Sequence, residues 1–468
     1  MSIYTQTLMT STIAIFLLSC KSTVNSHQPK GHFEGDFKQA DYNKIPKLSH
    51  ISEYLGNHYI VMGQNIVLSH VNYDLIKAIT ENKKPVYILT SDDRKEKLKT
   101  KLDENIPERL QKLVVIKSGQ PVGGERKING EYTSWARDWA PLSSADDNNK
   151  LHLLETNYYS HEPKSDAGPR IVKEISSSPL YSLPIENEGG NFMSNEDGVC
   201  VFTDWVYHRN EMMPQDSNKK DPQQVREAYR KLGCIYFLST GLIEGETTGH
   251  IDIFAKFLNR TTLAVNKITD ETLELAQSDE KELAKTVQGQ LEEIVNSLEA
   301  GLAEINKEDP NIKIEIVRVP MPLPLVWTDK KDSAKLSVFR SYLNSLILRP
   351  PNKHNENEGV MIVPRYGDKF VQYHRSDPKY TRKYPDSDLA KDYEDKVTTV
   401  FKNAGYNNLR FVNMDRSIAW GGATHCSTMQ VGLPCSMLDT ETCEARLDCK
   451  VSDNTNTHAC KEDYATSQ

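Results

Sequence analysis

Short apolar runs alternate with helix-like stretches along most of this 468-residue chain, and this alternation constrains the fold more than any other feature. From about Glu53 to Met429, many of the runs are separated by turns that contain Gly, Asn, Asp or Pro. The apolar runs lie at 66–68, 86–89, 113–116, 199–202, 263–265, 314–317 and 360–363. Strands that alternate with helices predict an α/β fold.

The clearest helical pattern spans about 270–305, where leucine, isoleucine and valine recur at helical spacing. Asp309-Pro310 ends this pattern, and its length predicts a break near Gln277-Ser278. Its apolar stripe is expected to pack in the core and to carry no chemistry. The length of the chain allows two or three domains or one large fold, so it leaves the domain count open.

The charge balance argues against a nucleic-acid partner. The formal net charge is −8, with 65 acidic and 57 basic residues, and no block of basic residues stands out. Such a surface offers a phosphate backbone little to bind. We therefore expect no nucleic acid among the partners.

The first twenty residues predict export. An apolar run from Ile13 to Leu18 is too short to span a bilayer, and Leu17-Leu18-Ser19-Cys20 resembles a bacterial lipobox. The resemblance implies that residues 1–20 are removed and that Cys20 is acylated, which would anchor the protein to a membrane of the cell envelope. No Lys or Arg precedes the run, so an ordinary secretory peptide or an overextended start is the alternative.

Cysteine usage agrees with an oxidising compartment. Four of the eight cysteines crowd the tail, namely Cys435, Cys443, Cys449 and Cys460. An even number near a terminus favours disulfides, whereas a zinc site is the alternative although paired two-residue gaps and histidines are missing. Cys200 and Cys234 each begin an apolar run and could be facing strand residues or buried thiols. We expect a polar linker at 21–50, a catalytic domain at 51–433 and a Cys-rich tail at 434–468.

Four runs join charged or nucleophilic side chains to aromatic or glycine neighbours. They are Trp135-Ala136-Arg137-Asp138-Trp139-Ala140-Pro141, Glu188-Gly189-Gly190-Asn191, Thr248-Gly249-His250-Ile251-Asp252, and Trp420-Gly421-Gly422-Ala423-Thr424-His425-Cys426-Ser427-Thr428-Met429-Gln430. Attack on a guanidinium carbon needs a soft, strong nucleophile and carboxylates that hold the planar nitrogens, and cysteine and aspartate meet that need. If the third run were a strand, His250 and Asp252 would point to the same face.

Each run taken alone has an ordinary structural explanation. Asp138 beside Arg137 could be a buried ion pair, and His250 could be a core histidine bonded to backbone. Cys426 could be another disulfide partner. Glycine pairs more often mark bulges or tight turns than active sites.

The ordered set of runs resembles the family of bacterial-type peptidylarginine deiminases and agmatine deiminases, which are guanidino-group modifying enzymes. That family shows Trp-x-Arg-Asp-x-Gly-Pro, Gly-Gly, Gly-His-x-Asp and Gly-Gly-x-x-His-Cys in this order. Residues 341–344 and 360–368 also resemble the family, so the likeness covers roughly 51–433. It implies a pentein fold, a five-bladed α/β propeller of ββαβ units, here with a Cys-rich C-terminal extension.

The resemblance also implies roles for single residues. Asp138 and Asp252 would hold the guanidinium, His250 would shuttle protons, and Cys426 would attack to give a thiouronium intermediate and release ammonia. Further candidates for substrate binding are Asn344, Trp135, Arg137, Gly190 and Asn191. The resemblance implies no metal and no organic cofactor.

Export and Asn191 favour arginine in peptides or proteins as the substrate, with citrulline as the product. Agmatine, giving N-carbamoylputrescine, is the alternative. Residues 158–166 lack the arginines with which the peptidylarginine branch clamps a terminal carboxylate, which favours internal arginines, and Trp139-Ala140 departs from the family pattern. Amidinotransfer is accessible from the same intermediate, and an inactive pentein that serves as a surface binding protein is a further alternative.

Overall fold

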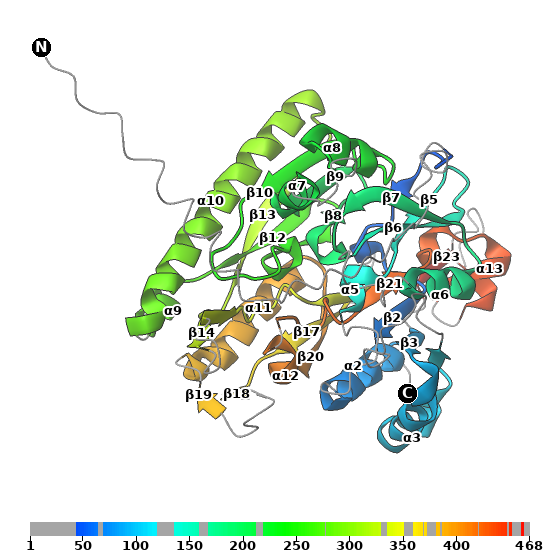
Figure 1. The fold of residues 1–468 in the computed structure, drawn as a ribbon, viewed down its shortest axis with the longest axis horizontal. Coiled ribbons are helices and arrows are strands. Elements are labelled where there is room, and N and C mark those ends of the chain that lie inside the picture. Colours follow the sequence, from blue (N-terminus) through cyan, green and yellow to red (C-terminus); the bar gives the residue numbers. More distant parts are fainter. Residues whose placement is uncertain are drawn as a thin grey trace, which may run out of the picture. The chain divides into compact units, whose positions relative to one another are not determined.

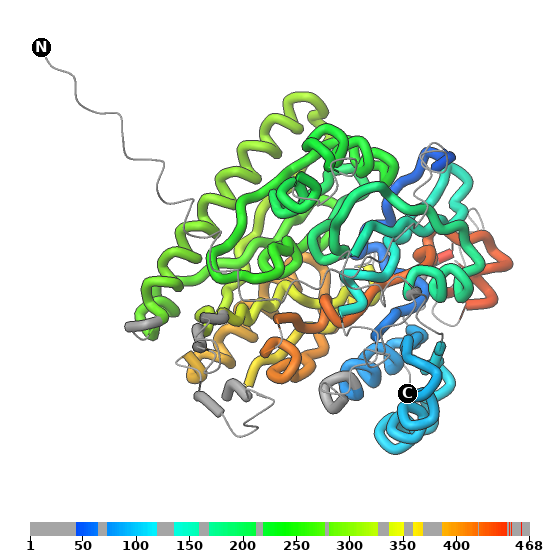
Figure 2. Tube along the Cα trace, viewed as in Figure 1, coloured from blue at the N-terminus to red at the C-terminus, as the bar shows by residue number. Residues whose placement is uncertain are grey.

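The computed structural model describes fourteen stretches of the chain. They are residues 44–63, 69–118, 135–158, 167–211, 219–276, 278–328, 335–350, 359–367, 369–371, 381–383, 386–419, 421–446, 449–451 and 460–462. The predicted leader with Cys20 and the apolar run at 66–68 lie outside them. Figure 2 colours the described residues along the Cα trace and leaves the others grey.

One pattern of strands recurs five times in the described part of the chain: an antiparallel pair is followed by a third strand that runs parallel to the second. The five sets are β21 (Met429–Val431), β2 (Tyr59–Gly63) and β3 (Val86–Thr90); β5 (Leu142–Ala145), β6 (Leu151–Asn157) and β7 (Leu180–Glu186); β8 (Met193–Ser194), β9 (Val199–Thr203) and β10 (Tyr236–Thr240); β11 (Ala255–Asn259), β12 (Thr262–Lys267) and β13 (Glu315–Pro320); and β16 (Leu346–Arg349), β17 (Val360–Arg365) and β20 (Asn408–Asn413).

Helices connect the second and third strands of these sets, as parallel pairing requires. The connecting helices are α2 (Ser69–Glu81); α6 (Ala167–Ser176); α7 (Trp205–Glu211) and α8 (Pro222–Arg230); α9 (Asp270–Glu274) and α10 (Ser278–Glu308); and α11 (Ala390–Asn403). Each set is therefore a ββαβ unit, and five such units confirm the predicted pentein architecture (Figure 1).

The remaining elements extend these units or lie between them. The helices are α3 (Lys95–Asn105), α4 (Glu108–Gln111), α5 (Ala136–Trp139), α12 (Asp415–Ile418) and α13 (Thr440–Ala445). The strands are β1 (Ser49–His50), β4 (Val114–Ser118), β14 (Leu325–Thr328), β15 (Lys335–Val338), β18 (Lys369–Val371), β19 (Thr381–Lys383), β22 (Cys449–Val451) and β23 (Cys460–Glu462). Short 3-10 helices include η1 (Glu53–Leu55), η2 (Asp92–Arg94), η3 (Gly189–Asn191), η5 (Ile251–Ile253), η6 (Ser387–Leu389) and η7 (Cys435–Met437).

One unit is completed by strands from opposite ends of the catalytic region. β21 pairs antiparallel with β2, so that Val61 lies opposite Met429, and Figure 1 shows this late strand beside the early one. The pairing holds the turn that contains Cys426 against the N-terminal part of the fold. The backbone N–H of Arg137 also donates to the carbonyl of Cys426, at 3.2 Å.

The long helical pattern forms two helices, and the predicted break is confirmed. Thr269 caps α9 by accepting a hydrogen bond from the backbone N–H of Thr272, and α10 begins at Ser278. The apolar stripe of α10 faces β10 and β12, where Val287 and Leu291 are fully buried. This helix is therefore part of the core and carries none of the candidate site residues.

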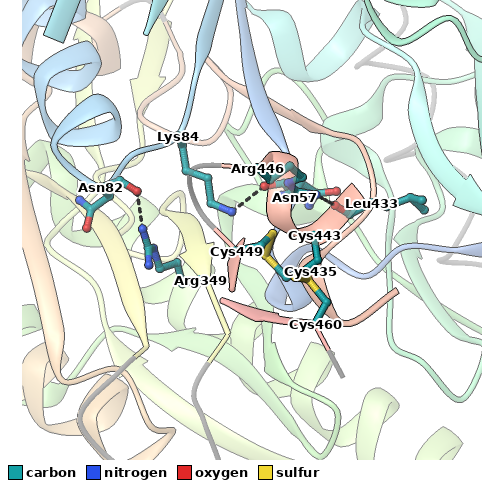
Figure 3. Close-up of a disulfide and its surroundings, with 10 residues drawn as sticks. All are labelled: Asn57, Asn82, Lys84, Arg349, Leu433, Cys435, Cys443, Arg446, Cys449 and Cys460. Carbon is teal, nitrogen blue, oxygen red and sulfur yellow. Dashed lines mark hydrogen bonds between the residues drawn. A yellow bond between two sulfur atoms is a disulfide. The ribbon is translucent and has the colours of Figure 1, made fainter. Parts of the chain in front are cut away.

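Six cysteines form disulfides: Cys200–Cys234, Cys435–Cys449 and Cys443–Cys460. The predicted disulfides of the tail are confirmed, and the zinc alternative is wrong because its four thiols are paired with each other. Figure 3 shows the two tail disulfides beside Arg446, which donates to the carbonyl of Leu433 at 2.6 Å. Among the residues that the structure describes, no helix combines the length and the apolarity needed to cross a bilayer.

Candidate active site

Short segments from distant parts of the sequence place their side chains together beside the turn that precedes β21. Asp138 lies in α5, Gly190 in η3 and Asp252 in η5. The segment η3 contacts both α5 and η5, and all three residues are buried. Cys426 lies in the turn itself, so the four sequence runs converge on one place.

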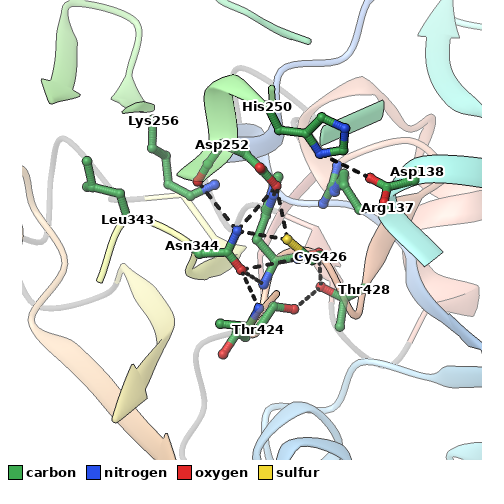
Figure 4. A network of polar contacts seen from close by, with 12 residues as sticks. Arg137, Asp138, His250, Asp252, Lys256, Leu343, Asn344, Thr424, Cys426 and Thr428 are labelled. Carbon is green, nitrogen blue, oxygen red and sulfur yellow. Dashed lines mark hydrogen bonds and ion pairs between the residues drawn. The ribbon is translucent and has the colours of Figure 1, made fainter. Parts of the chain in front are cut away.

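Cys426 is the free cysteine of the described residues, and its side chain is buried. Asn344 donates from Nδ2 to Cys426 Sγ at 3.0 Å, and Asp252 Oδ2 lies 3.6 Å from the same sulfur (Figure 4). The other end of the Asn344 amide accepts hydrogen bonds from the backbone N–H groups of Ala423 and His425, each at 3.1 Å. One asparagine therefore holds the loop and contacts the thiol.

His250 lies between two carboxylates. Its Nε2 pairs with Glu188, and its Nδ1 lies 3.6 Å from Asp138 Oδ1. The expected strand through His250 and Asp252 is wrong, because His250 precedes the 3-10 helix η5. Gly249 adopts φ +73° there, and a β-carbon at that glycine would lie 2.7 Å from the Trp205 ring, so only glycine fits this turn.

The two side chains nevertheless come close together beside Gly190. A β-carbon on Gly190 would lie 2.6 Å from His250 Nδ1, 3.0 Å from Asp138 Oδ1 and 3.3 Å from Asp252 Oδ1. Both of these carboxylate oxygens are buried and accept no hydrogen bond. Buried carboxylate oxygens usually have donors, so these two oxygens are suited to a ligand that brings N–H groups.

The electrostatics of the site favour a cationic ligand. Burial raises the pKa of Asp138 to about 8, although His250 opposes the shift. Burial alone would lower the pKa of His250, but Asp138 and Glu188 raise it to about 10. Burial and then the carboxylates of Asp252 and Asp138 raise the pKa of the Cys426 thiol well above its usual value. A cation at this site would lower the pKa of Asp138 and of the Cys426 thiol, because it stabilises their charged forms.

The other predicted site residues lie around this site in different roles. Trp135 packs on Gly422, where a β-carbon would lie 2.5 Å from the indole. Arg137 directs its Nη atoms to Glu53 and to Gln430, so these atoms bind protein groups. Asn191 Oδ1 accepts from the backbone N–H of Thr203 at 2.9 Å and thereby holds the strand end next to His250. Of residues 158–166, the structure describes only Tyr158.

Three residues near the site were not assigned a role from the sequence. Glu188 and His425 lie inside the quoted runs, so their proximity to the glycines and to Cys426 was available as a signal. Glu53 lies far from every run and pairs with Arg137, Lys256 and His425. No motif pointed to Glu53, and only the fold brings it to the site.

A metal ion is geometrically possible at one point of the pocket. Ligand atoms of Asp138, Glu188 and His250 lie within 4.8 Å of one another. His250 already hydrogen-bonds to Glu188, however, and an ion bound by both would have to replace that contact. The arrangement can hold a planar cation while a thiol approaches from the side of Asp252.

Comparisons with known proteins agree with this geometry. Residues 66–432 match the family described as Porphyromonas-type peptidyl-arginine deiminase. A Photobacterium profundum protein provisionally named agmatine deiminase is 24% identical over 312 residues, which is 64% of this chain and 74% of the relative. A Listeria monocytogenes protein with a similar provisional name is 22% identical over 341 residues, covering 68% of this chain and 83% of the relative.

A solved structure shows the same fold. The agmatine deiminase of Enterococcus faecalis superposes with a TM-score of 0.56 at 15% identity, over 82% of this chain and 95% of that chain. At this identity the structural likeness is evidence for the fold alone, whereas the family match covers well over half of the sequence. The chain therefore belongs to the Porphyromonas-type peptidyl-arginine deiminase family and is a guanidino-group deiminase of the pentein fold.

Proposed function

We propose that the protein deiminates small free guanidines of the agmatine class, with Cys426 as the nucleophile. The observation that carries the chemistry is the pair of buried oxygens on Asp138 and Asp252 that accept no hydrogen bond and lie close together beside Gly190 and His250. Two carboxylates can hold the planar nitrogens of a guanidinium and fix its carbon in line with the sulfur.

The reaction begins when the bound guanidinium adds positive charge next to the carboxylates and the Cys426 sulfur. Its charge favours ionisation of the Cys426 thiol, whose proton passes to solvent, and the thiolate adds to the guanidinium carbon to give a tetrahedral adduct. His250 donates a proton to one nitrogen, the C–N bond breaks, and ammonia leaves. A positively charged thiouronium remains on the sulfur.

Water completes the reaction. His250, now without that proton, takes a proton from water as the oxygen attacks the same carbon. The C–S bond then breaks as the hydroxyl of the adduct gives up its proton to the departing sulfur, which restores the Cys426 thiol and releases the ureido product. Glu188 supports both steps, because its contact with His250 Nε2 directs Nδ1 toward the pocket.

The relatives and the burial of the site support a small substrate. The Photobacterium and Listeria relatives both carry the name agmatine deiminase. His250 and Asp252 are each 1% exposed and Cys426 is 4% exposed, so the reacting carbon has to enter deeply. A slender free alkylguanidine can do so without bringing a polypeptide surface against the site.

Peptidyl-arginine is the second candidate, favoured by the family description and by the three disulfides. Disulfides form in oxidising compartments, which supports export, where proteins are available as substrates.

We propose that the protein reaches the cell envelope through acylation of Cys20. Metabolic labelling with a fatty acid analogue tests this, because labelling should disappear in Cys20→Ser.

One assay separates the substrates. The purified protein is given agmatine, benzoyl-arginine amide, a peptide ending in arginine and free arginine, and the ureido product is measured. We expect the highest kcat/KM with agmatine and no product with Cys426→Ala. Activity on benzoyl-arginine amide without activity on agmatine would overturn the small-guanidine proposal and leave the cysteine mechanism intact.

A further inference from the structure

Next to the candidate site, the Glu53 carboxylate contacts three nitrogen-bearing side chains. Its carboxylate pairs with Arg137, accepts from Lys256 Nζ at 3.1 Å and lies 2.7 Å from His425 Nε2. These partners come from α5, β11 and the turn before β21, which are distant in sequence. Burial alone would raise the pKa of Glu53, but Arg137, His425 and Lys256 hold it well below its ordinary value, so the carboxylate is charged.

His425 connects Glu53 to one of the two carboxylates of the pocket. Its Nδ1 lies 2.6 Å from Asp252 Oδ2, while its Nε2 faces Glu53. Both contacts are hydrogen bonds when each ring nitrogen carries a proton. Asp252 Oδ2 also accepts from Asn344 at 3.3 Å, whereas Oδ1 accepts no hydrogen bond and lies beside Gly190.

Arg137 connects Glu53 to the other carboxylate. It directly precedes Asp138 in α5, and its backbone N–H donates to the carbonyl of Cys426 at 3.2 Å. Its Nη2 donates to Gln430 Oε1 at 2.7 Å, which ties α5 to β21. The Arg137 side chain therefore fixes the segment that carries Asp138 against the strand that follows the cysteine.

We propose that Glu53 and His425 are positioning residues that set the separation of Asp138 and Asp252, an inference that rests on the proposed guanidinium grip. Neither residue supplies one of the three atoms that lie nearest to a β-carbon built on Gly190. Their effect passes through Arg137 on one side and through Asp252 on the other. A change at Glu53 therefore alters recognition of a planar cation more than it alters the thiol itself.

Two alkylating agents that differ in charge can test this. 2-Chloroacetamidine carries a planar cation that needs both carboxylates, whereas iodoacetamide is neutral and needs only the thiol. The rate of modification of Cys426 by each reagent is followed by peptide mass spectrometry in the full chain. The second-order rate constant for 2-chloroacetamidine divided by that for iodoacetamide measures how well the two carboxylates hold a planar cation. The kcat and KM for agmatine are measured in parallel.

Glu53→Gln keeps the volume but removes the charge, and His425→Gln removes the link to Asp252. We expect the ratio to fall at least tenfold in each variant and the KM for agmatine to rise. Asp386→Asn is the matched control, because Asp386 is a fully buried partner of Arg340 in another ion pair. The control should lose stability with an unchanged ratio.

The outcomes separate the two levels of inference. A wild-type protein that forms no ureido product and shows no preference for the amidine would overturn the proposed function. A wild-type preference that both variants retain would overturn the positioning role alone. Equal losses with both reagents in Glu53→Gln, matched by Asp386→Asn, would reduce Glu53 to a purely structural residue and would also overturn the proposal.

Discussion

The pocket and the C-terminal tail contain equally buried cysteines in opposite chemical settings. Cys426 is 4% exposed, and the tail cysteines are between 0% and 7% exposed. Each tail cysteine has another sulfur as its partner, whereas Cys426 has Asn344 and the oxygen of Asp252. Burial therefore does not distinguish a disulfide sulfur from the sulfur proposed as the nucleophile, whereas the neighbouring groups do.

The two regions also differ in how they are held together. The small cluster of the tail consists of four cysteines with Leu438 and Val451 packed against it, so covalent links replace a large core. The pocket is built on segments that extensive apolar clusters support. Buried carboxylate oxygens that accept no hydrogen bond destabilise the fold. The large core around the candidate site can offset this loss of stability, whereas the small cluster of the tail could not.

The largest expected effect comes from removing the pocket cysteine. Cys426→Ala should lower kcat by about a million-fold, because the covalent route is lost. Cys443→Ala with Cys460→Ala removes a tail disulfide and should leave kcat within about twofold of wild type, since these sulfurs lie in a separate cluster. Ureido product is measured for both proteins. Residual turnover of Cys426→Ala near the wild-type rate would break the comparison.

Adding a side chain at Gly190 should have the next largest effect. A methyl group there would lie within 3.3 Å of His250, Asp138 and Asp252 and would displace them from one another. We expect Gly190→Ala to lower kcat/KM by about 100-fold, as a misplacement of about 1 Å can. Gly241→Ala is the matched control, because a β-carbon there meets no atom within 4 Å. Comparable losses in both variants would argue against a ligand site at Gly190.

The pH dependence should show the unusual charge of the pocket. Asp138 has a pKa of about 8 and is neutral below it, and the Cys426 thiol has a pKa well above its usual value, so both groups gain their reactive form as pH rises. His250 loses its proton near its pKa of about 10. We expect kcat/KM to rise from about pH 7 to about pH 9 and to fall above about pH 10.

Circular dichroism over the same range checks that the fold persists. A kcat/KM that falls between about pH 7 and about pH 9 would contradict the assignment of these groups. The double variant Cys443→Ala with Cys460→Ala should reproduce the wild-type profile, because it leaves the Cys435–Cys449 disulfide in place and frees no thiol.

The sequence singled out four residues that the fold brings together, but it did not predict the local backbone that carries them. Cys426, His250, Asp138 and Asp252 stood out because each lies in a run whose composition is unusual, and the fold brings all four together. The break before Ser278 and the tail disulfides were also predictable, since both rest on local spacing.

Long-range contacts could not be predicted in the same way. Glu53 is an ordinary glutamate in sequence, and it has its partners because η1 lies against β11 and because the turn before β21 brings His425 to its carboxylate. The strand expected through His250 does not form, because Gly249 adopts a positive φ that the alternation of apolar and polar residues does not predict. A sequence motif identifies candidate residues, whereas the direction in which each side chain points depends on the packing around it.

The smallest expected effect concerns stability alone and lies in the tail. The Cys443–Cys460 disulfide closes a loop with a sequence separation of 17, so its loss should lower the free energy of unfolding by about 3 kcal/mol if the tail unfolds with the rest. Thermal unfolding of the double alanine variant measures this loss. If the tail instead unfolds separately, the main transition should stay unchanged while protease cuts the tail first. Either result keeps the comparison, because agmatine turnover at 25 °C stays near wild type in both cases, and a large loss of turnover would show that the tail supports the pocket after all.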